Sequence, residues 1–255
     1  MDSKQRFSSR VENYVKYRPG YPAGVVETLR AGCGLTPESV VADFGSGTGL
    51  LARLFLEFGC TVYGVEPNAD MRSAGERLLA EYPRFHSLDG SAESAPLPAG
   101  FVDFATAGQA FHWFDPAAAR AEFLRILRPG GWAVLVWNER SLDATPFLRA
   151  YEDLLQRFGT DYREVTQRNV QPDGPALRTF FGDAPRQAHF EYIQRFDFAG
   201  VKGRMLSSSY VPEKGHPNHE PMLAELGRVF DQHQQDGFVS IVYDTVMYYA
   251  RLANK

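Results

Sequence analysis

The sequence lacks the features that mark secreted, membrane-spanning and duplex-binding proteins. It has two cysteines, Cys33 and Cys60, in 255 residues, which is too few for a disulfide framework. It has no run of 18 or more apolar residues, so we expect no membrane span. Its 27 Lys and Arg against 31 Asp and Glu give a net charge of −4, without the basic excess typical of nucleic-acid-binding proteins. We therefore expect a cytoplasmic protein that binds neither membranes nor nucleic acid.

What the sequence does have is a regular alternation of short apolar segments with helical ones between residues 40 and 138. Strands are expected at 40–44, 61–66, 85–88, 101–107 and 132–137, and helices at 22–31, 50–58, 67–82 and 116–127. Near-continuous apolar strands joined by helices are typical of a parallel sheet buried on both faces. Right-handed crossovers then favour a doubly wound arrangement.

After residue 138 the pattern changes. Helices are expected at 145–158 and 220–235, and strands at 189–198 and 238–252. We expect the two late strands to complete the sheet as an antiparallel edge pair. The predicted fold class is α/β: a Rossmann-like doubly wound seven-stranded sheet of five parallel strands plus an antiparallel pair. Helical insertions at about 143–187 and 200–236 are expected to cover the carboxyl edge of the sheet, where open α/β sheets bind ligands.

The most informative segment is a glycine-rich turn after the first strand, Asp43-Phe44-Gly45-Ser46-Gly47-Thr48-Gly49. Such a turn lets backbone N–H groups approach a nucleotide or a nucleoside. The dinucleotide fingerprint G-x-G-x-x-G is not met, because the third glycine comes one position early and Leu50 takes its place. The carboxylate of Asp43 would repel a pyrophosphate, but it could face a cationic amino acid.

This turn resembles motif I of class I S-adenosylmethionine-dependent methyltransferases, D-x-G-x-G-x-G. Four further matches follow in order, at Glu66, Gly90-Ser91-Ala92-Glu93, Ala107-Gly108-Gln109 and Arg128-Pro129-Gly130-Gly131. The resemblance implies S-adenosyl-L-methionine as cofactor, with Glu66 binding the ribose diol. The cofactor-binding residues that it implies are Asp43, Gly45, Ser46, Gly47, Gly49, Glu66, Pro67, Met71, Ser91, Ala92, Glu93, Ala107, Gln109, Tyr17 and Arg18.

Four other segments narrow the resemblance. YRPGYP, AFHWFD, VWNER and SSSYVPEKG look like a subgroup of small methyltransferases, type 11, similar to trans-aconitate and related small-acid methyltransferases. The resemblance implies one domain, 1–255, with a lid at 1–39, a cofactor-binding core at 40–138, and the substrate-side insertions and last two strands at 139–255. It also implies a small-molecule acceptor, with oxygen (carboxylate or hydroxyl) favoured, and a monomer or homodimer.

Four residues are candidates for the acceptor side: Tyr14, His112, Trp113 and Tyr210. His112 could take a proton from a hydroxyl acceptor, or it could serve only to cap the next helix. The aromatic face of Trp113 suits a sulfonium cation, or belongs to the core. No metal site is expected. Two alternatives to methyl transfer stay open, an NAD-dependent oxidoreductase, which Asp43 and Leu50 disfavour, and a non-catalytic S-adenosylmethionine-binding protein.

Overall fold

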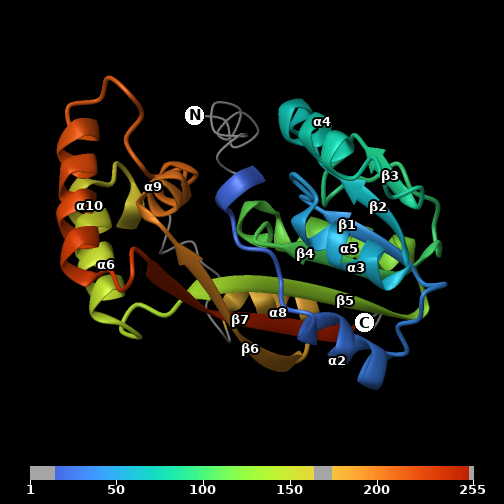
Figure 1. Cartoon of the computed structure of the whole chain (residues 1–255). Helices are drawn as coiled ribbons and strands as arrows, with labels where there is room; N and C mark the ends of the chain where they lie inside the picture. Colours follow the sequence, from blue (N-terminus) through green and yellow to red (C-terminus); the bar gives the residue numbers. More distant parts are fainter. Residues whose placement is uncertain (1–14, 164–173, 253–255) are drawn as a thin grey trace.

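A computed structural model describes residues 15–163 and 174–252 of the chain. Its centre is a sheet in the order β3-β2-β1-β4-β5-β7-β6, with helices around it (Figure 1). The strands are β1 (Val40–Phe44), β2 (Thr61–Val65), β3 (Phe85–Leu88), β4 (Val102–Gly108), β5 (Leu127–Arg140), β6 (Arg186–Phe196) and β7 (Val239–Arg251). The helices are α2 (Gly24–Cys33), α3 (Leu50–Phe58), α4 (Ala69–Leu78), η2 (Phe111–Trp113), α5 (Pro116–Ile126), α6 (Pro146–Phe158), α8 (Pro175–Phe181), α9 (Phe198–Leu206) and α10 (His219–His233).

The strand directions confirm the predicted fold class. Strands β1 to β5 pair in parallel, and β7 runs antiparallel to both β5 and β6. Strand β6 therefore points the same way as the first five strands, at the far edge of the sheet. This is a Rossmann-like sheet with an antiparallel pair at one edge.

Helices cover both faces of the central strands. Helices α2 and α3 pack on one face, where Phe55 of α3 meets side chains such as Val41 and Val62. Helices α5 and α8 pack on the other face, where Phe123 of α5 stacks on Phe44 at 4.5 Å between ring centroids. Burial on both faces explains why the strands read as continuous apolar runs.

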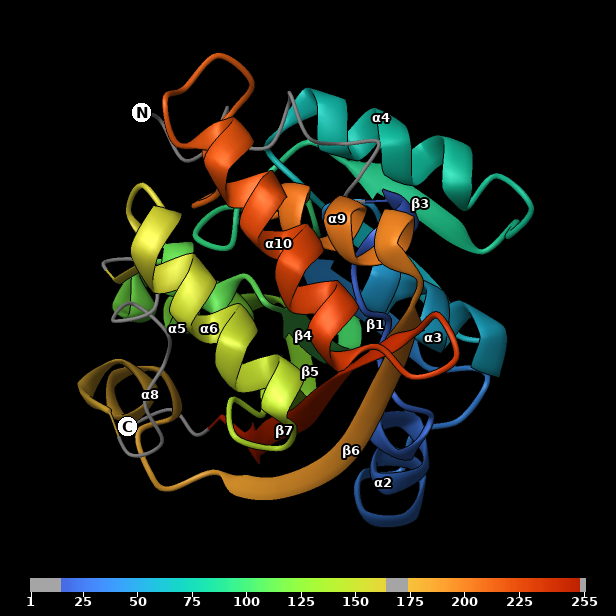
Figure 2. The same ribbon diagram turned by 60° about the vertical axis from the view of Figure 1, so that its left-hand side comes forward.

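Chain connectivity places three helices at the carboxyl edge of the sheet. Strand β5 leads into α6, β6 leads into α9, and α10 precedes β7, which runs in the opposite direction. These three helices share a separate apolar core with the adjoining end of β7, and Figures 1 and 2 show α6 beside α10. None of the helices in 15–163 and 174–252 has the length and apolar character that crossing a membrane requires.

Two helices depart from the sequence-based expectations. The helical insertion at about 143–187 was expected to cover the carboxyl edge, but its helix α8 packs against α5 on a face of the sheet, through Phe180 and Phe181. Its paired phenylalanines supply an apolar face, and Pro175 favours a helix start. The strand expected to end at 198 ends at Phe196, because Asp197 accepts a hydrogen bond from Gly200 N at 2.7 Å and begins α9.

Candidate active site

The glycine-rich turn leaves the end of β1 in a backbone conformation that glycine favours. Gly45, Gly47 and Gly49 have φ angles of 61°, 57° and 85°, all left-handed. A Cβ added at Gly45 would stand 2.6 Å from Cβ of Ala110, so a side chain there would collide with the opposite wall. The turn is tied to β2 because Gly45 N donates to Val65 O at 2.9 Å. Because these glycines have no side chains, the backbone of the turn can lie directly beside a cavity.

Glu66 joins this turn to the start of α4. Its Oε2 accepts a hydrogen bond from Gly47 N at 2.9 Å, and its Oε1 accepts one from Asn68 N at 2.8 Å. Burial raises the pKa of Glu66, while the two backbone donors and the nearby Arg72 guanidinium lower it in part. Glu66 is therefore a buried carboxylate in a fixed orientation, and each of its oxygens accepts one of these two hydrogen bonds.

Asp43 lies beneath the turn. Its Oδ1 accepts from Thr106 Oγ1 at 2.8 Å, and Thr106 is its register partner on the neighbouring strand β4. Burial raises the pKa of Asp43 to about 7, against the opposing effect of the Thr106 hydrogen bond. Its Oδ2 is buried and makes no hydrogen bond to any of the residues in 15–163 and 174–252. The side chain supports the turn from below and is absent from the cavity wall described next.

A cavity of about 170 Å³ opens beside the turn at the carboxyl ends of the strands. It brings together, from the predicted cofactor-binding set, Gly45, Gly47, Glu66, Pro67, Met71, Ser91, Ala92, Glu93 and Gln109, and from the acceptor set Trp113. The other wall residues are Asn68, Gly108, Ala110 and Phe114. Asn68 carries a recognisable signal, since it caps α4 by accepting from Met71 N at 3.0 Å. Predicted residues that the wall does not include are Asp43, Ser46, Gly49, Ala107, Tyr17, Arg18, His112 and Tyr210.

The aromatic turn after β4 forms one side of this cavity. Trp113 and Phe114 lie on its wall. His112 belongs to the same turn and stands beside Trp113, with ring centroids 4.7 Å apart. Gln109, which begins this region, has a left-handed φ of 57°, and its Nε2 donates to Asn138 O at 2.9 Å. That hydrogen bond fixes the end of β4 against β5.

The segment before α2 runs from the cavity to α9. Tyr17 packs on Gly203 of α9, where an added Cβ would stand 2.5 Å from Tyr17 Cζ. Arg18 Nη2 donates to Ser207 O at 3.0 Å. Helix α2, which also falls in the segment expected to act as a lid, packs on the sheet instead. Tyr14 lies outside the described residues.

The same segment meets the cavity and the end of β5. Tyr21 packs against Gly108 on the cavity wall, since a Cβ at that glycine would stand 2.5 Å from Tyr21 Oη. Asn138 Nδ2 donates to Gly20 O at 2.9 Å. The segment is therefore held at both ends, by the cavity wall and by α9.

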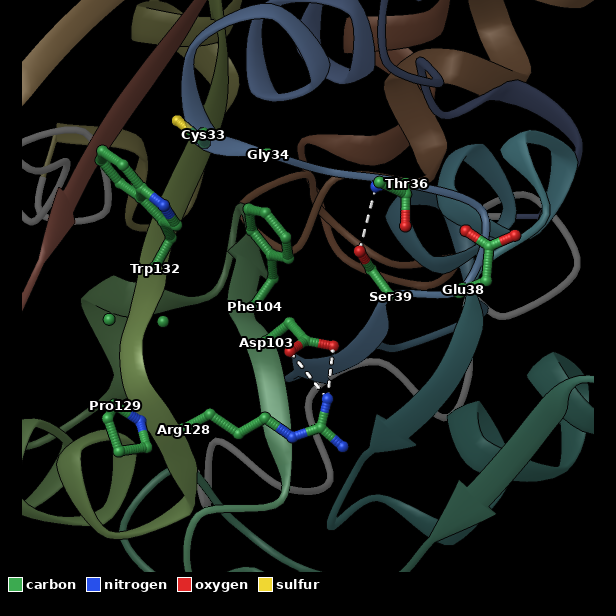
Figure 3. Close-up of a pocket in the computed structure, with 12 residues that line it drawn as sticks. Cys33, Gly34, Thr36, Glu38, Ser39, Asp103, Phe104, Arg128, Pro129 and Trp132 are labelled. Atoms are coloured by element: carbon green, nitrogen blue, oxygen red, sulfur yellow. Dashed lines mark hydrogen bonds and ion pairs between the residues drawn. The ribbon is translucent and has the colours of Figure 1, made fainter.

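A larger cavity, of about 400 Å³, lies at the opposite edge of the sheet (Figure 3). Its wall comes from the residues that lead into β1, β4 and β5, that is, from the amino ends of these strands. Its central charges neutralise one another, since Arg128 Nη1 bonds both oxygens of Asp103 at 2.8 and 2.9 Å. Asp103 also accepts from Val40 N at 2.8 Å. These contacts tie strand starts together, so we place the active-site candidate in the smaller cavity.

Metal binding finds no support in the part of the chain that the structure describes. Within it, no group of three or more His, Cys, Asp or Glu side chains is arranged to hold a metal ion.

A Rossmann-like sheet with a glycine-rich turn and an acid at the end of β2 defines a nucleoside-binding protein. Residues 42–135 match the model of a family described as a methyltransferase domain. An uncharacterized methyltransferase-like protein of Schizosaccharomyces pombe is 30% identical over 246 residues, which cover 95% of this chain and 93% of that protein. The chain belongs to the class I S-adenosylmethionine-dependent methyltransferases, and S-adenosylmethionine is the cofactor of this family.

A second relative agrees with this assignment, and a solved structure shares the fold. An uncharacterized methyltransferase of Mycobacterium tuberculosis (strain H37Rv) is 36% identical over 163 residues. The match covers 64% of each chain, so this chain spans slightly less than two thirds of that relative. The solved structure of a candidate type II methyltransferase from Anaeromyxobacter dehalogenans superposes with a TM-score of 0.66 at 21% identity, covering 94% of this chain and 100% of that one. This likeness shows a shared fold.

Proposed function

We propose that this chain transfers a methyl group from S-adenosylmethionine to an oxygen atom, carboxylate or hydroxyl, of a small-molecule acceptor. The observation that carries the proposal is the Glu66 carboxylate, held by Gly47 N and Asn68 N on the wall of a glycine-lined cavity. Neither the site nor the relatives give support to an oxidoreductase or to a protein that binds S-adenosylmethionine without turnover.

The cavity residues fit S-adenosylmethionine. Each oxygen of Glu66 accepts a single hydrogen bond within the described chain, and a carboxylate oxygen has room for a second, so the pair suits the two hydroxyls of a ribose. Gly45 and Gly47 leave the backbone open where a side chain would intrude. When bound, S-adenosylmethionine supplies a methyl group on a positively charged sulfur. The rings of Trp113 and Phe114 on the wall suit such a cation, by about 0.5–2 kcal/mol for each favourable contact.

The surroundings of the cavity support a small acceptor. Helices α6, α9 and α10 and the segment before α2 lie at the same edge of the sheet as the cavity, where they could enclose a small acceptor. Enclosure excludes water and aligns reactants, which is the main requirement of methyl transfer. A hydroxyl acceptor must also lose a proton, and His112, next to Trp113, is our candidate to take it. A carboxylate acceptor needs no base. The preference for oxygen rests on the resemblance to small-acid methyltransferases.

Cofactor binding is tested by titration calorimetry with S-adenosylhomocysteine and, separately, with NAD. We expect the wild type to bind S-adenosylhomocysteine and not NAD. Glu66→Ala should weaken binding by at least about 10-fold, because each charge-assisted hydrogen bond contributes about 1.5–3 kcal/mol. Glu76→Gln is the matched control, since Glu76 is an exposed acid of the neighbouring helix α4. Binding of NAD alone, or equal affinity in Glu66→Ala and Glu76→Gln, would refute the proposal.

The acceptor atom is tested by incubating the enzyme with methyl-labelled S-adenosylmethionine and a metabolite extract. A carboxyl methyl ester releases labelled methanol in mild alkali, whereas a methyl ether keeps its label. A product labelled on nitrogen or carbon would contradict an oxygen acceptor.

A further inference from the structure

A group of arginines lies beyond the cavity, and none of them belongs to its wall. Arg204 of α9 is 6% exposed. Its Nε donates to Tyr243 Oη at 3.0 Å and its Nη1 to Ser208 Oγ at 3.2 Å. Both partners are neutral hydroxyls, and no salt bridge joins Arg204 to an acid in residues 15–163 and 174–252. Among the described residues, Arg204 is thus a buried cation without an acid paired to it.

A second buried cation, Arg140, stands at the end of β5. Its Nη2 contacts Glu152 Oε2 at 2.7 Å and Tyr162 Oη at 2.7 Å, and the side chains of Arg140 and Glu152 are each 11% exposed. Nε of Arg140 is buried and has no hydrogen-bond partner among the described residues. Glu152 therefore balances Arg140, and within 15–163 and 174–252 no acid pairs with Arg204.

Arg18 and Arg204 meet at adjacent residues, since Arg18 Nη2 donates to Ser207 O and Arg204 Nη1 donates to Ser208 Oγ. Burial raises the pKa of Tyr210, but the positive charges of Arg140, Arg204 and Arg18 and a hydrogen bond with the Ser208 side chain together outweigh that effect, so its pKa lies below the ordinary value for tyrosine. Three guanidinium groups from three distant segments thus act on a single phenol. Tyr210 also packs on Tyr162, with ring centroids 4.8 Å apart.

The cluster adjoins the cavity. Arg140 lies two residues beyond Asn138 on β5, which corresponds to about 7 Å along a strand, and Asn138 O accepts from the cavity-wall residue Gln109. Arg18 lies three residues before Tyr21, at most about 10 Å along the chain, and Tyr21 packs on the cavity wall. An acceptor placed between them could have one end in the cluster and the other in the cavity.

Burying a cation without a counter-charge is costly, and arginine's planar fork matches a carboxylate. The last-turn position of Arg204 in α9 offers partial compensation from the helix dipole, but this amounts to about half a unit charge. We propose that Arg204 and Arg18, together with the Tyr210 hydroxyl, bind a carboxylate group of the acceptor. The substrate class is then a small organic acid. This inference rests on the proposed methyl transfer.

The test measures anion binding without turnover. Thermal unfolding of the full chain saturated with S-adenosylhomocysteine is followed with succinate, with citrate, with inorganic phosphate and with the uncharged succinamide. We expect succinate or citrate to raise the melting temperature in a saturable way, and succinamide to leave it unchanged. In Arg204→Gln the apparent affinity for the carboxylate should fall by about tenfold or more. Arg228→Gln, at an exposed arginine of α10, should behave as the wild type.

Arg18→Gln is the second variant, because half-buried Arg18 can be removed with less risk to folding than Arg204. We expect the same loss of carboxylate affinity in Arg18→Gln, with affinity for S-adenosylhomocysteine unchanged in Arg204→Gln. Equal melting shifts in wild type and both variants, equal shifts with succinamide, or stabilisation by phosphate alone would overturn the carboxylate subsite. Failure of the wild type to bind S-adenosylhomocysteine would instead overturn the proposed function.

Discussion

Replacing Gly203 by alanine should detach the segment before α2 from helix α9. A Cβ at Gly203 would stand 2.5 Å from Tyr17 Cζ and closer still to two other carbons of that ring. Carbon atoms in contact prefer about 3.5–4.0 Å, so the ring must move by about 1 Å or more. The perturbation is confined to one contact, because Gly203 lies inside α9, where alanine is otherwise favourable.

The magnitude follows from two opposing effects. Alanine gains about 0.5–1 kcal/mol over glycine in a helix, whereas overpacking costs about 1–3 kcal/mol. Gly32 is the matched control, since it is an exposed glycine of α2 with nothing within 4 Å of an added Cβ. Gly32→Ala should therefore gain stability, and Gly203→Ala should be about 1–3 kcal/mol less stable than Gly32→Ala. For a chain of this size that is a difference of about 2–12 °C in melting temperature.

The assay is thermal unfolding of both variants, followed by titration with S-adenosylhomocysteine. We expect Gly203→Ala to melt below Gly32→Ala and to bind S-adenosylhomocysteine more weakly, because Tyr21 of the same segment packs on the cavity wall. If the two variants have the same melting temperature and the same affinity, Tyr17 does not dock on α9 and the reasoning fails.

Two further predictions concern buried charges. Because the pKa of Asp43 is raised to about 7 in the folded chain, its protonated form is favoured on folding, and the stability that it contributes below pH 4 is lost as the pH rises to about 7. Denaturant unfolding should show the ligand-free wild type losing stability relative to Asp43→Asn over that interval; parallel pH profiles would contradict this. Glu152→Ala, which leaves Arg140 buried without its acid, should cost about 3–5 kcal/mol of unfolding free energy. Glu225→Ala, which breaks the exposed pair with Arg228, should cost at most about 1 kcal/mol, and equal losses in the two variants would contradict the burial argument.

The cofactor half of the fold could be predicted because its signals are local. Helix α3 begins and ends where expected, since Gly49 and Gly59 adopt left-handed φ angles of 85° and 107° at its two ends. The turn and Glu66 are separated by one helix and one strand, so their meeting follows from parallel pairing of β1 with β2. Cofactor binding by Asp43 stays a prediction, and the sequence could not show that its carboxyl group faces Thr106, a pairing that depends on β4 lying next to β1.

The acceptor half could not be predicted in this way because its contacts are not local. Tyr210 was selected from a serine-rich stretch, yet its charged neighbours Arg18, Arg140 and Arg204 come from a terminal segment, a strand end and a helix. Periodicity does not report such contacts. Helix α9 itself was missed, although Asp197 provides a cap signal at its start, because two glycines within the helix weaken its propensity.

The net charge of −4 is a poor guide to the anions that this chain can bind. Exposed acids are screened by salt over about 8–10 Å, whereas buried cations are screened much less. Arg140 and Arg204 are both buried, and Glu152 pairs with Arg140. An anionic acceptor that reaches the cluster would therefore meet a positive potential, although the protein as a whole is acidic. The attraction would depend little on the charges of exposed side chains. Sensitivity to salt therefore distinguishes binding at the buried arginine cluster from binding at exposed charges. Carboxylate binding at the cluster should weaken only modestly when sodium chloride is raised, whereas binding governed by exposed charges would fall steeply.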